Sequence, residues 1–260
     1  MLSFIDLGKW LHLPILASEH GKDVDKLIIY VHWLMLVLFI GWTGYFCYVL
    51  FRFRRSRNPK ADPVGVRSHF STWLEVGVAL VEAVLLIGFA VPLWAKVADE
   101  FPDERQSTVV RVTAQQFLWN SRYSGKDGKF GKQDERLVSS DNPLGLVKDD
   151  PDGKDDVVPP INLITVPVNK PVIAHITSMD VIHSFKVLPL RVTQDAIPGM
   201  SIPTHFVPTK EGRYLINCAQ LCGNSHYSMK GFLDVVSVEK FDAWLAEHSK
   251  TSAGAAGGFE

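Results

Sequence analysis

Five residues in the second half of the chain could together bind a soft metal ion. Four of them lie in the string Cys218-Ala-Gln-Leu-Cys222-Gly-Asn-Ser-His226-Tyr-Ser-Met229, and the fifth is His183, which lies 35 residues before Cys218. Thiolate, imidazole and thioether groups suit copper, whereas magnesium, calcium and manganese favour oxygen ligands. Copper is therefore the predicted metal, and we expect His183 to reach the site from a neighbouring strand.

The second cysteine of this string requires an explanation of its own. A single blue-copper ion needs one thiolate, two histidines and a weak methionine ligand. Two thiolates can instead bridge two copper ions, which shares charge across the pair and favours rapid electron transfer. Two alternatives use the same residues: a structural zinc site, which leaves Met229 without a role, and a disulfide between Cys218 and Cys222. A C-x-x-C-H motif for covalent haem attachment is absent.

Composition excludes some classes of function and divides the chain into two parts. The 260 residues carry a formal net charge of −1, so the chain lacks the basic excess of a nucleic-acid-binding protein. Three cysteines are too few for a disulfide scaffold, and Cys47 lies in an apolar run where packing is its expected role. Nearly all the sustained apolar sequence precedes residue 95. We therefore expect the two parts to occupy different environments.

Two segments before residue 95 are predicted to cross a membrane. The first, Leu27–Phe51, has 25 residues, more than the roughly 20 that a helix needs to span the hydrocarbon core. The second runs from about Leu74 to Trp94, with Pro92 and Trp94 at its end. Residues 1–26 contain acidic and basic groups and fit an interfacial segment better than a cleaved signal peptide. Residues 27–95 thus form a transmembrane hairpin.

The connection between the two spans, residues 52–69, is strongly basic. It carries one acid, Asp62, and six basic residues: Arg52, Arg54, Arg55, Arg57, Lys60 and Arg67. Positive charges near the ends of spans stay in the cytoplasm. Both termini and everything after residue 95 are therefore predicted to lie on the periplasmic or an equivalent outer side, with the spans in the cell inner membrane.

Residues 96–248 are predicted to form an external β-domain. Short runs rich in β-branched residues alternate with Pro, Gly, Asp and Asn, which is typical of a sandwich or small barrel of roughly 100 residues. The predicted strands are STVVRVTAQQFLW, NLITVPV, VIAHITS, IPTHFVPT, RYLINC and GFLDVVSV. Val238–His248 has helical periodicity, and residues 249–260 resemble a flexible tail.

A charged insertion, residues 124–160, interrupts the strands. It contains nine acidic and six basic residues. An EF-hand does not fit. With Gly153 at the sixth loop position, where a glycine is required, Lys148 falls at the first position, where an acidic ligand is needed. We expect a solvated surface loop, with a docking surface for a basic partner as the alternative.

At this point the sequence resembles cytochrome c oxidase subunit II over almost its whole length. The C-x3-C-x3-H-x2-M string carries the resemblance, together with Asp180-Val-Ile-His183-Ser and Asp195-Ala-Ile-Pro-Gly199. The resemblance implies a two-helix transmembrane hairpin followed by an all-β cupredoxin-like sandwich. It also implies a binuclear copper centre of two copper ions, whose ligands would be His183, Cys218, Cys222, His226, Met229 and the backbone carbonyl of Gln220.

Two departures from the family pattern affect the surroundings of this centre. Many members have Glu at the position of Gln220, where the side chain helps to bind magnesium between subunits. An amide is a weaker ligand for a hard cation, so a magnesium site is doubtful. The segment Gln116-Phe117-Leu118-Trp119 resembles a family stretch with more tryptophans, and Phe117 takes the position at which electrons usually enter. Phe117 and Trp119 are therefore the residues at which electrons are predicted to enter the domain.

The second span carries two carboxylates seven residues apart, Glu75 and Glu82, which therefore lie on one helical face. Carboxylates within a membrane normally face protein or water, so we expect a partner subunit to cover this face. Glu75 matches the family position at the entrance of a proton channel into subunit I. Glu82 replaces a frequent Pro, and an interhelical hydrogen bond is its expected role. His32 in the first span is expected to pack or to lie at the interface.

The predicted function is electron transfer within a proton-translocating respiratory haem–copper oxidase. The chain would pass electrons from an external cytochrome c-type donor, soluble or within a larger complex, to the haems of subunit I, where dioxygen is reduced to water. A quinol oxidase subunit would not need the copper ligands. Two alternatives remain: a subunit of a copper-dependent nitric oxide reductase, and a membrane-tethered copper-binding protein or metallochaperone.

Overall fold

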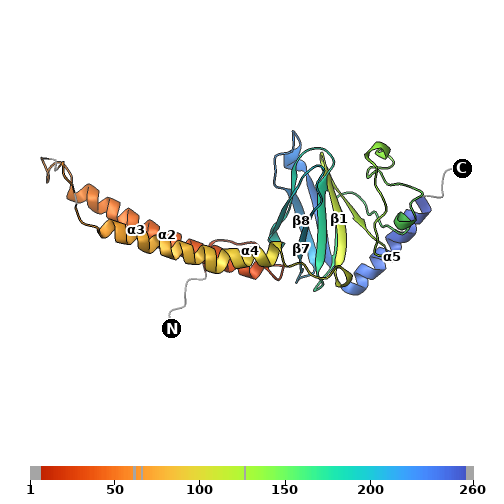
Figure 1. The fold of residues 1–260 in the computed structure, drawn as a ribbon, viewed down its shortest axis with the longest axis horizontal. Coiled ribbons are helices and arrows are strands. Elements are labelled where there is room, and N and C mark those ends of the chain that lie inside the picture. The colour runs from red at the N-terminus through yellow and green to blue at the C-terminus, as the bar shows by residue number, and fades with distance from the viewer. Residues whose placement is uncertain (1–6, 61–62, 66, 126, 256–260) are drawn as a thin grey trace. The chain divides into compact units, whose positions relative to one another are not determined.

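The computed structural model describes residues 7–60, 63–65, 67–125 and 127–255, and these residues form two compact units. The first unit comprises residues up to 13 and residues 23–96, and the second comprises residues 14–22 and those from 97 onward. Figure 1 shows long helices in the first unit and layered strands in the second. This architecture confirms the predicted fold class.

The first unit is an antiparallel pair of long apolar helices. After the short α1 (Leu7–Trp10), α2 runs over Gly21–Arg52. The second rod joins α3 (Phe70–Leu85), a π-helical turn η1 (Leu86–Ala90) and α4 (Val91–Ala98). Both rods, of 32 and 29 residues, are long and apolar enough to cross a membrane. Each extends beyond the predicted span by several residues.

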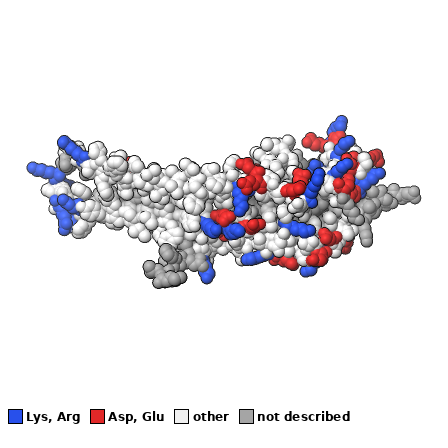
Figure 2. Space-filling model, turned by 60° about the horizontal axis from the view of Figure 1, so that its bottom comes forward, with Lys and Arg blue, Asp and Glu red and all other residues white. Residues whose placement is uncertain are grey.

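An ion pair and a ring contact join the two rods in the halves that are farther from the basic connection. Asp23 on α2 forms ion pairs with Lys26 and, across the pair, with Lys96 on α4. The rings of Tyr30 and Phe89 meet edge to face at 5.4 Å. Figure 2 shows a nearly uncharged surface along the helices and basic groups gathered at the connection. Such a surface suits a hydrocarbon environment.

The second unit is a sandwich of a four-stranded and a five-stranded sheet. The first sheet has the order β2-β1-β4-β7 and the second β3-β9-β8-β5-β6. The strands of the first sheet are β1 (Thr108–Gln115), β2 (Leu118–Tyr123), β4 (Val172–Ser178) and β7 (Ile202–Phe206). Those of the second are β3 (Leu163–Pro167), β5 (His183–Val187), β6 (Val192–Ala196), β8 (Gly212–Cys218) and β9 (Lys230–Val236).

The core lies between the sheets and is built from alternating apolar residues of both. Val110, Val112 and Ala114 of β1 are buried, as are Ile216 of β8 and Leu233 of β9. Trp119 packs its ring edge to face against Phe185 at a centroid distance of 5.6 Å. This core fixes the register of the strands whose ends carry the predicted metal ligands.

Residues 14–22 form part of the β-domain, although the sequence carries no strand pattern there. Ala17 is fully buried, and its N–H donates to the carbonyl of Pro189 while its carbonyl accepts from the N–H of Thr209. The Ser18 hydroxyl donates to the carbonyl of Leu190 at 2.5 Å. The guanidinium of Arg191 donates to the carbonyls of Pro14 and Ile15.

The insertion 124–160 is anchored to the sheet and is not a purely solvated loop. It contains η3 (Glu135–Leu137) and η4 (Pro151–Gly153). The buried guanidinium of Arg122 on β2 pairs with Asp156 at 3.3 Å and donates to the carbonyl of Gly131 at 2.9 Å. Burial raises the pKa of Asp156, against the opposing effects of the Gly131 N–H and Arg122. The expectation of a solvated loop was therefore wrong for its base.

Helix α5 (Val238–Ala255) covers one end of the domain and extends seven residues beyond the predicted end at His248. Phe241 and Trp244 of this helix stack on each other and contact the ring of Tyr123. Residues 249–255 of the predicted flexible tail are thus helical, and residues 256–260 lie outside the described part of the chain. Two of the predicted metal ligands lie at strand ends of this sandwich: His183 is the first residue of β5, and Cys218 is the last residue of β8.

Candidate metal centre

The two cysteine sulfurs form the middle of a compact donor cluster. Cys218 is the last residue of β8, and Cys222 lies in the loop between β8 and β9. Their Sγ atoms are 3.8 Å apart, far beyond the roughly 2.05 Å of a disulfide, and both cysteines are free. A disulfide, one of the alternatives considered above, is not formed in this structure.

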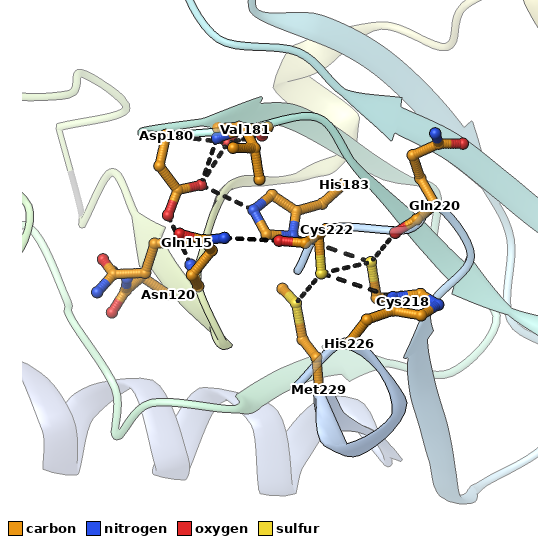
Figure 3. A network of polar contacts seen from close by, with 12 residues as sticks. Gln115, Asn120, Asp180, Val181, His183, Cys218, Gln220, Cys222, His226 and Met229 are labelled. Atoms are coloured by element: carbon orange, nitrogen blue, oxygen red, sulfur yellow. Dashed lines mark hydrogen bonds and ion pairs between the residues drawn. The ribbon is translucent and has the colours of Figure 1, made fainter. Parts of the chain in front are cut away.

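Each sulfur has a histidine and a second donor beside it. Next to Cys218 Sγ lie the Gln220 carbonyl oxygen at 3.1 Å and His183 Nδ1 at 3.9 Å. Next to Cys222 Sγ lie His226 Nδ1 at 3.5 Å and the Met229 sulfur at 3.8 Å. Figure 3 shows these donors converging on the sulfur pair. The structure thus brings together all six predicted ligands.

The chain geometry explains why these residues meet. His183 begins β5, which pairs with β8 so that Phe185 lies opposite Cys218. The returning loop is short and ends in η6 (His226–Ser228), which turns His226 and Met229 toward the sulfurs before β9 starts. The ligand atoms of His183, Cys218 and Cys222 all lie within 4.8 Å of one another. The spacing in the 218–229 string therefore places its donors around one point.

The cluster is largely shielded from water. His183 is fully buried, and Cys222 and Met229 are 4% and 2% exposed. Burial, together with the neighbouring Cys218, raises the pKa of the Cys222 thiol to about 11. A metal that binds this thiolate must therefore displace a proton.

Asp180 orients the imidazole of His183. One of its carboxylate oxygens lies 2.8 Å from His183 Nε2, which leaves Nδ1 directed at the sulfurs. The same oxygen accepts the Val181 N–H, and the other accepts the Gln116 N–H at 2.7 Å. Burial opposes ionisation of this carboxyl, but the bonds from His183, Gln116 and Val181 lower its pKa overall. The sequence analysis assigned no role to Asp180; a carboxylate three residues before a candidate ligand was the available signal.

The aromatic segment divides into one buried and one half-exposed residue. Trp119 is 1% exposed and lies edge to face with His183 at a centroid distance of 6.2 Å. Phe117 is half-buried and rests on the loop at Gly223, where an added Cβ would come 3.1 Å from its ring. Only Phe117 can therefore meet a second protein at the surface. The same loop exposes Leu221 and Tyr227, at 76% and 90%.

The donor set fits copper chemically. Two thiol sulfurs, two imidazoles and a thioether are soft ligands, and Met229 lies against Cys222, whereas a zinc site would leave it unused. The carbonyl of Gln220 completes the set, while its side-chain amide points away from the sulfurs (Figure 3).

The carboxylates of the second apolar rod belong to the helical unit and not to the unit that holds this cluster. Glu75 and Glu82 are both on α3, and both are exposed on the surface of the helical unit. Within the described residues neither carboxylate has a hydrogen bond or an ion pair. His32 on α2 has its Nδ1 at 2.7 Å from the backbone carbonyl of Ile28, a local contact within its own helix.

Comparison with known proteins gives consistent matches. Residues 108–236 match the family described as cytochrome c oxidase subunit II, periplasmic domain. An alternative cytochrome c oxidase subunit 2 of Bradyrhizobium diazoefficiens is 34% identical over 249 residues, covering 95% of this chain and 87% of that protein. Cytochrome c oxidase subunit 2 of Cereibacter sphaeroides is 29% identical over 245 residues, covering 90% and 77%.

Among solved structures, one similar chain is the periplasmic domain of subunit II of cytochrome oxidase from Bradyrhizobium japonicum. It is 28% identical and covers 59% of this chain and 100% of its own length, with a TM-score of 0.44.

Proposed function

Because the chain belongs to the cytochrome c oxidase subunit II family, we propose that it accepts electrons from an external donor and passes them through a binuclear copper centre to subunit I. The observation that carries this proposal is the pair of sulfurs 3.8 Å apart with a histidine and a second donor beside each. When bound, the copper pair would supply one-electron redox chemistry.

The six residues would hold the metal pair as follows. The thiolates of Cys218 and Cys222 would be the central ligands of both ions. His183 and His226 would bind through Nδ1, the atom that each directs at the sulfurs. Met229 and the Gln220 carbonyl would be the weaker ligands, one near each sulfur. Burial of His183 and Met229 would hold the ligand geometry fixed when the charge of the centre changes, which lowers the cost of reorganisation.

Electrons would reach this centre at the half-exposed Phe117, and Trp119 would act from within. Phe117 touches the loop that follows Cys222, and Trp119 lies against His183. A donor surface placed on Phe117 would therefore be separated from the ligands by one layer of side chains. The donor would be a cytochrome c-type protein, soluble or part of a larger complex.

In the assembled oxidase the helices would lie in the inner membrane and contact the haem-bearing subunit I, where dioxygen is reduced. The basic connection would be cytoplasmic, and both termini and the copper domain would be outside. Glu75 would lie at the entrance of a proton route into subunit I. Exchange of metal with a partner, as in a metallochaperone, fits less well, since His183 is fully buried and Met229 is 2% exposed.

The test is the metal content and paramagnetic spectrum of the full chain in detergent after incubation with copper and zinc. We expect two copper ions per chain and a signal from one electron shared equally by both ions. Cys218→Ser and Cys222→Ser should each abolish this signal, because a hydroxyl cannot replace a bridging thiolate. Met229→Leu should retain it with a changed potential, since the thioether is the weaker ligand. One zinc ion per chain and no copper would contradict the proposal.

A further inference from the structure

Gln116 is the one residue of the aromatic turn that bonds to both sides of the metal cluster. It lies between β1 and β2, and its side-chain Nε2 donates to the carbonyl of Cys222 at 2.6 Å. Its backbone N–H donates at 2.7 Å to Asp180, which holds His183 through its other carboxylate oxygen. Cys222 and His183 come from different segments of the five-stranded sheet. A single residue of the four-stranded sheet therefore ties both of them to the aromatic turn.

The contact at Gly223 shows how closely this turn lies on the metal loop. Gly223 has a φ of +134°, and an added Cβ would stand 2.7 Å from Gln116 Nε2 as well as against the Phe117 ring. This backbone conformation and this clearance are available only to glycine. The peptide between Cys222 and Gly223 is therefore held on one side by the Gln116 amide and on the other by the turn at Gly223.

We propose that Gln116 is a positioning residue that locks the Phe117 turn onto the metal loop and fixes the ligand geometry of Cys222. The inference rests on the proposed function, because it assigns Gln116 a part in accepting electrons. Two effects follow from one hydrogen bond. The bond holds Phe117 at contact distance from the loop. It also fixes the backbone of Cys222 and so the position of its sulfur, as outer-sphere partners orient ligands at metal sites.

A simpler alternative is that Gln116 belongs to the docking surface, since much of it is exposed in this chain. The two roles differ in what they change. A docking residue alters the rate of reaction with the donor and leaves the spectrum and copper affinity of the isolated protein unchanged. A positioning residue alters the spectrum and the affinity even where no donor is present.

The experiment compares Gln116→Met with Gln115→Met in the full chain in detergent. Methionine keeps the side-chain length and removes the donor, and Gln115 is the matched control because its side chain bonds to Asn120 and not to the metal loop. We expect Gln116→Met to bind copper about tenfold more weakly, the scale typical of outer-sphere residues. We also expect altered hyperfine splitting and slower reduction by a small reagent that does not dock, with the control unchanged. A spectrum and affinity equal to wild type would overturn the proposal, whatever the donor kinetics.

Two further measurements keep the result decisive. If Gln116→Met yields too little folded protein, Gln116→Asn, whose amide is one methylene shorter, is judged by the same criterion. In copper-free wild-type protein, the side-chain amide protons of Gln116 should exchange with solvent more slowly than those of Gln220, whose side chain points away from the cluster (Figure 3). Equal exchange rates for the amide protons of Gln116 and Gln220 would by themselves overturn the positioning role of Gln116. A wild-type protein without the two-copper signal would instead overturn the proposed function.

Discussion

Individual buried residues show how the domain reconciles polar groups with a hydrophobic core. The guanidinium of Arg122 is 1% exposed, yet it has Asp156 and the Gly131 carbonyl as partners, and the ring of Phe130 lies 5.2 Å from it. Burial lowers the pKa of Arg122 and raises that of Asp156, so desolvation offsets part of their mutual attraction. The pair therefore fixes the position of the insertion more than it adds net stability.

Replacing Asp156 by Asn should destabilise the domain, because it leaves a buried cation without its counter-charge. Breaking such a pair costs roughly 3–5 kcal/mol, because the remaining buried charge has no counter-charge. We expect a smaller loss, about 2 kcal/mol, since an Asn oxygen still accepts hydrogen bonds. Chemical denaturation of the full chain measures it. Asp152→Asn is the control, because Asp152 forms only an exposed contact of 3.8 Å with Lys129. Equal effects of both substitutions would show that the buried pair has no special role.

At the level of strands and loops, the sequence predicts the elements that alternate cleanly and misses those with mixed faces. Val172–Ser178 and Gly212–Cys218 match predicted runs. His183 was expected on a neighbouring strand, but the bounds His183–Val187 were not predicted, because burial of His183 and Ser184 beside apolar residues removes the alternation. The predicted strand ending at Trp119 is two strands that turn at Gln116 and Phe117. No Gly or Pro marks this turn.

The metal ligands were more predictable than their supports for a similar reason. Cys218, Cys222, His226 and Met229 lie within twelve residues, so local spacing reveals them. Asp180 and Gln116 act through hydrogen bonds to segments distant in sequence, and Asp is common at turns. Residues 14–22 join the domain through backbone groups, which leave no signature in side-chain pattern.

The attachment of residues 14–22 leads to a prediction about stability. Ser18 is 2% exposed, and Ser18→Ala would leave the Leu190 carbonyl without its side-chain donor. The expected loss in unfolding free energy is about 1–2 kcal/mol. Ser140→Ala, at an exposed position of the insertion, should change the unfolding free energy by less than about 0.5 kcal/mol.

We also expect a fragment beginning near Gln106 to fold as a water-soluble β-sandwich but to unfold at a lower temperature than one supplied with residues 14–22. Identical unfolding temperatures would argue against this role.

At the scale of the whole molecule, the helical unit presents carboxylates where a hydrocarbon environment would surround them. Glu82 lies near the middle of the rod Phe70–Ala98, and Glu75 lies two turns closer to the basic connection. A carboxylate at the centre of a span costs about 2.5–3.5 kcal/mol on insertion scales, so a polar partner group in another subunit is expected to face it.

Glu75→Gln should slow proton uptake in the assembled oxidase while copper content and the reduction rate of the copper centre stay unchanged. The reason is its place at the end of the second rod that meets the basic connection, the end proposed to be cytoplasmic, and distant along the chain from every proposed copper ligand. Flash-induced proton uptake and haem reduction kinetics measure the effect. Glu82→Gln is the comparison on the same face, where an amide can keep a hydrogen bond to a partner helix, so we expect normal uptake. Normal turnover in Glu75→Gln would remove this residue from the proton route.

The distribution of charge on the β-domain bears on how its electron donor arrives. Of the nine acidic residues in the insertion, Asp150 and Asp156 are buried, and along the sequence the others are interspersed with six basic residues. This mixture attracts a basic protein only weakly from a distance. The potentials of neighbouring opposite charges largely cancel, and salt screens what remains beyond a Debye length of roughly 8–10 Å. The loop that carries the candidate ligands has no Asp, Glu, Lys or Arg between Cys218 and Met229, and it exposes Leu221 and Tyr227.

We therefore expect the donor to be held in a complex or by a tether and to contact Phe117 directly. Stopped-flow reduction of the copper centre by its native donor should depend little on ionic strength, because no charge-steered encounter limits the rate. Phe117→Ala should slow reduction about tenfold, the scale on which an aromatic anchor contributes to an interface. Trp119→Phe should leave donor binding unchanged and alter the spectrum, since Trp119 is buried against His183. A rate that collapses with added salt would indicate a soluble cytochrome steered by charge. Unaltered rates in both variants would place the route of the electron elsewhere on the domain.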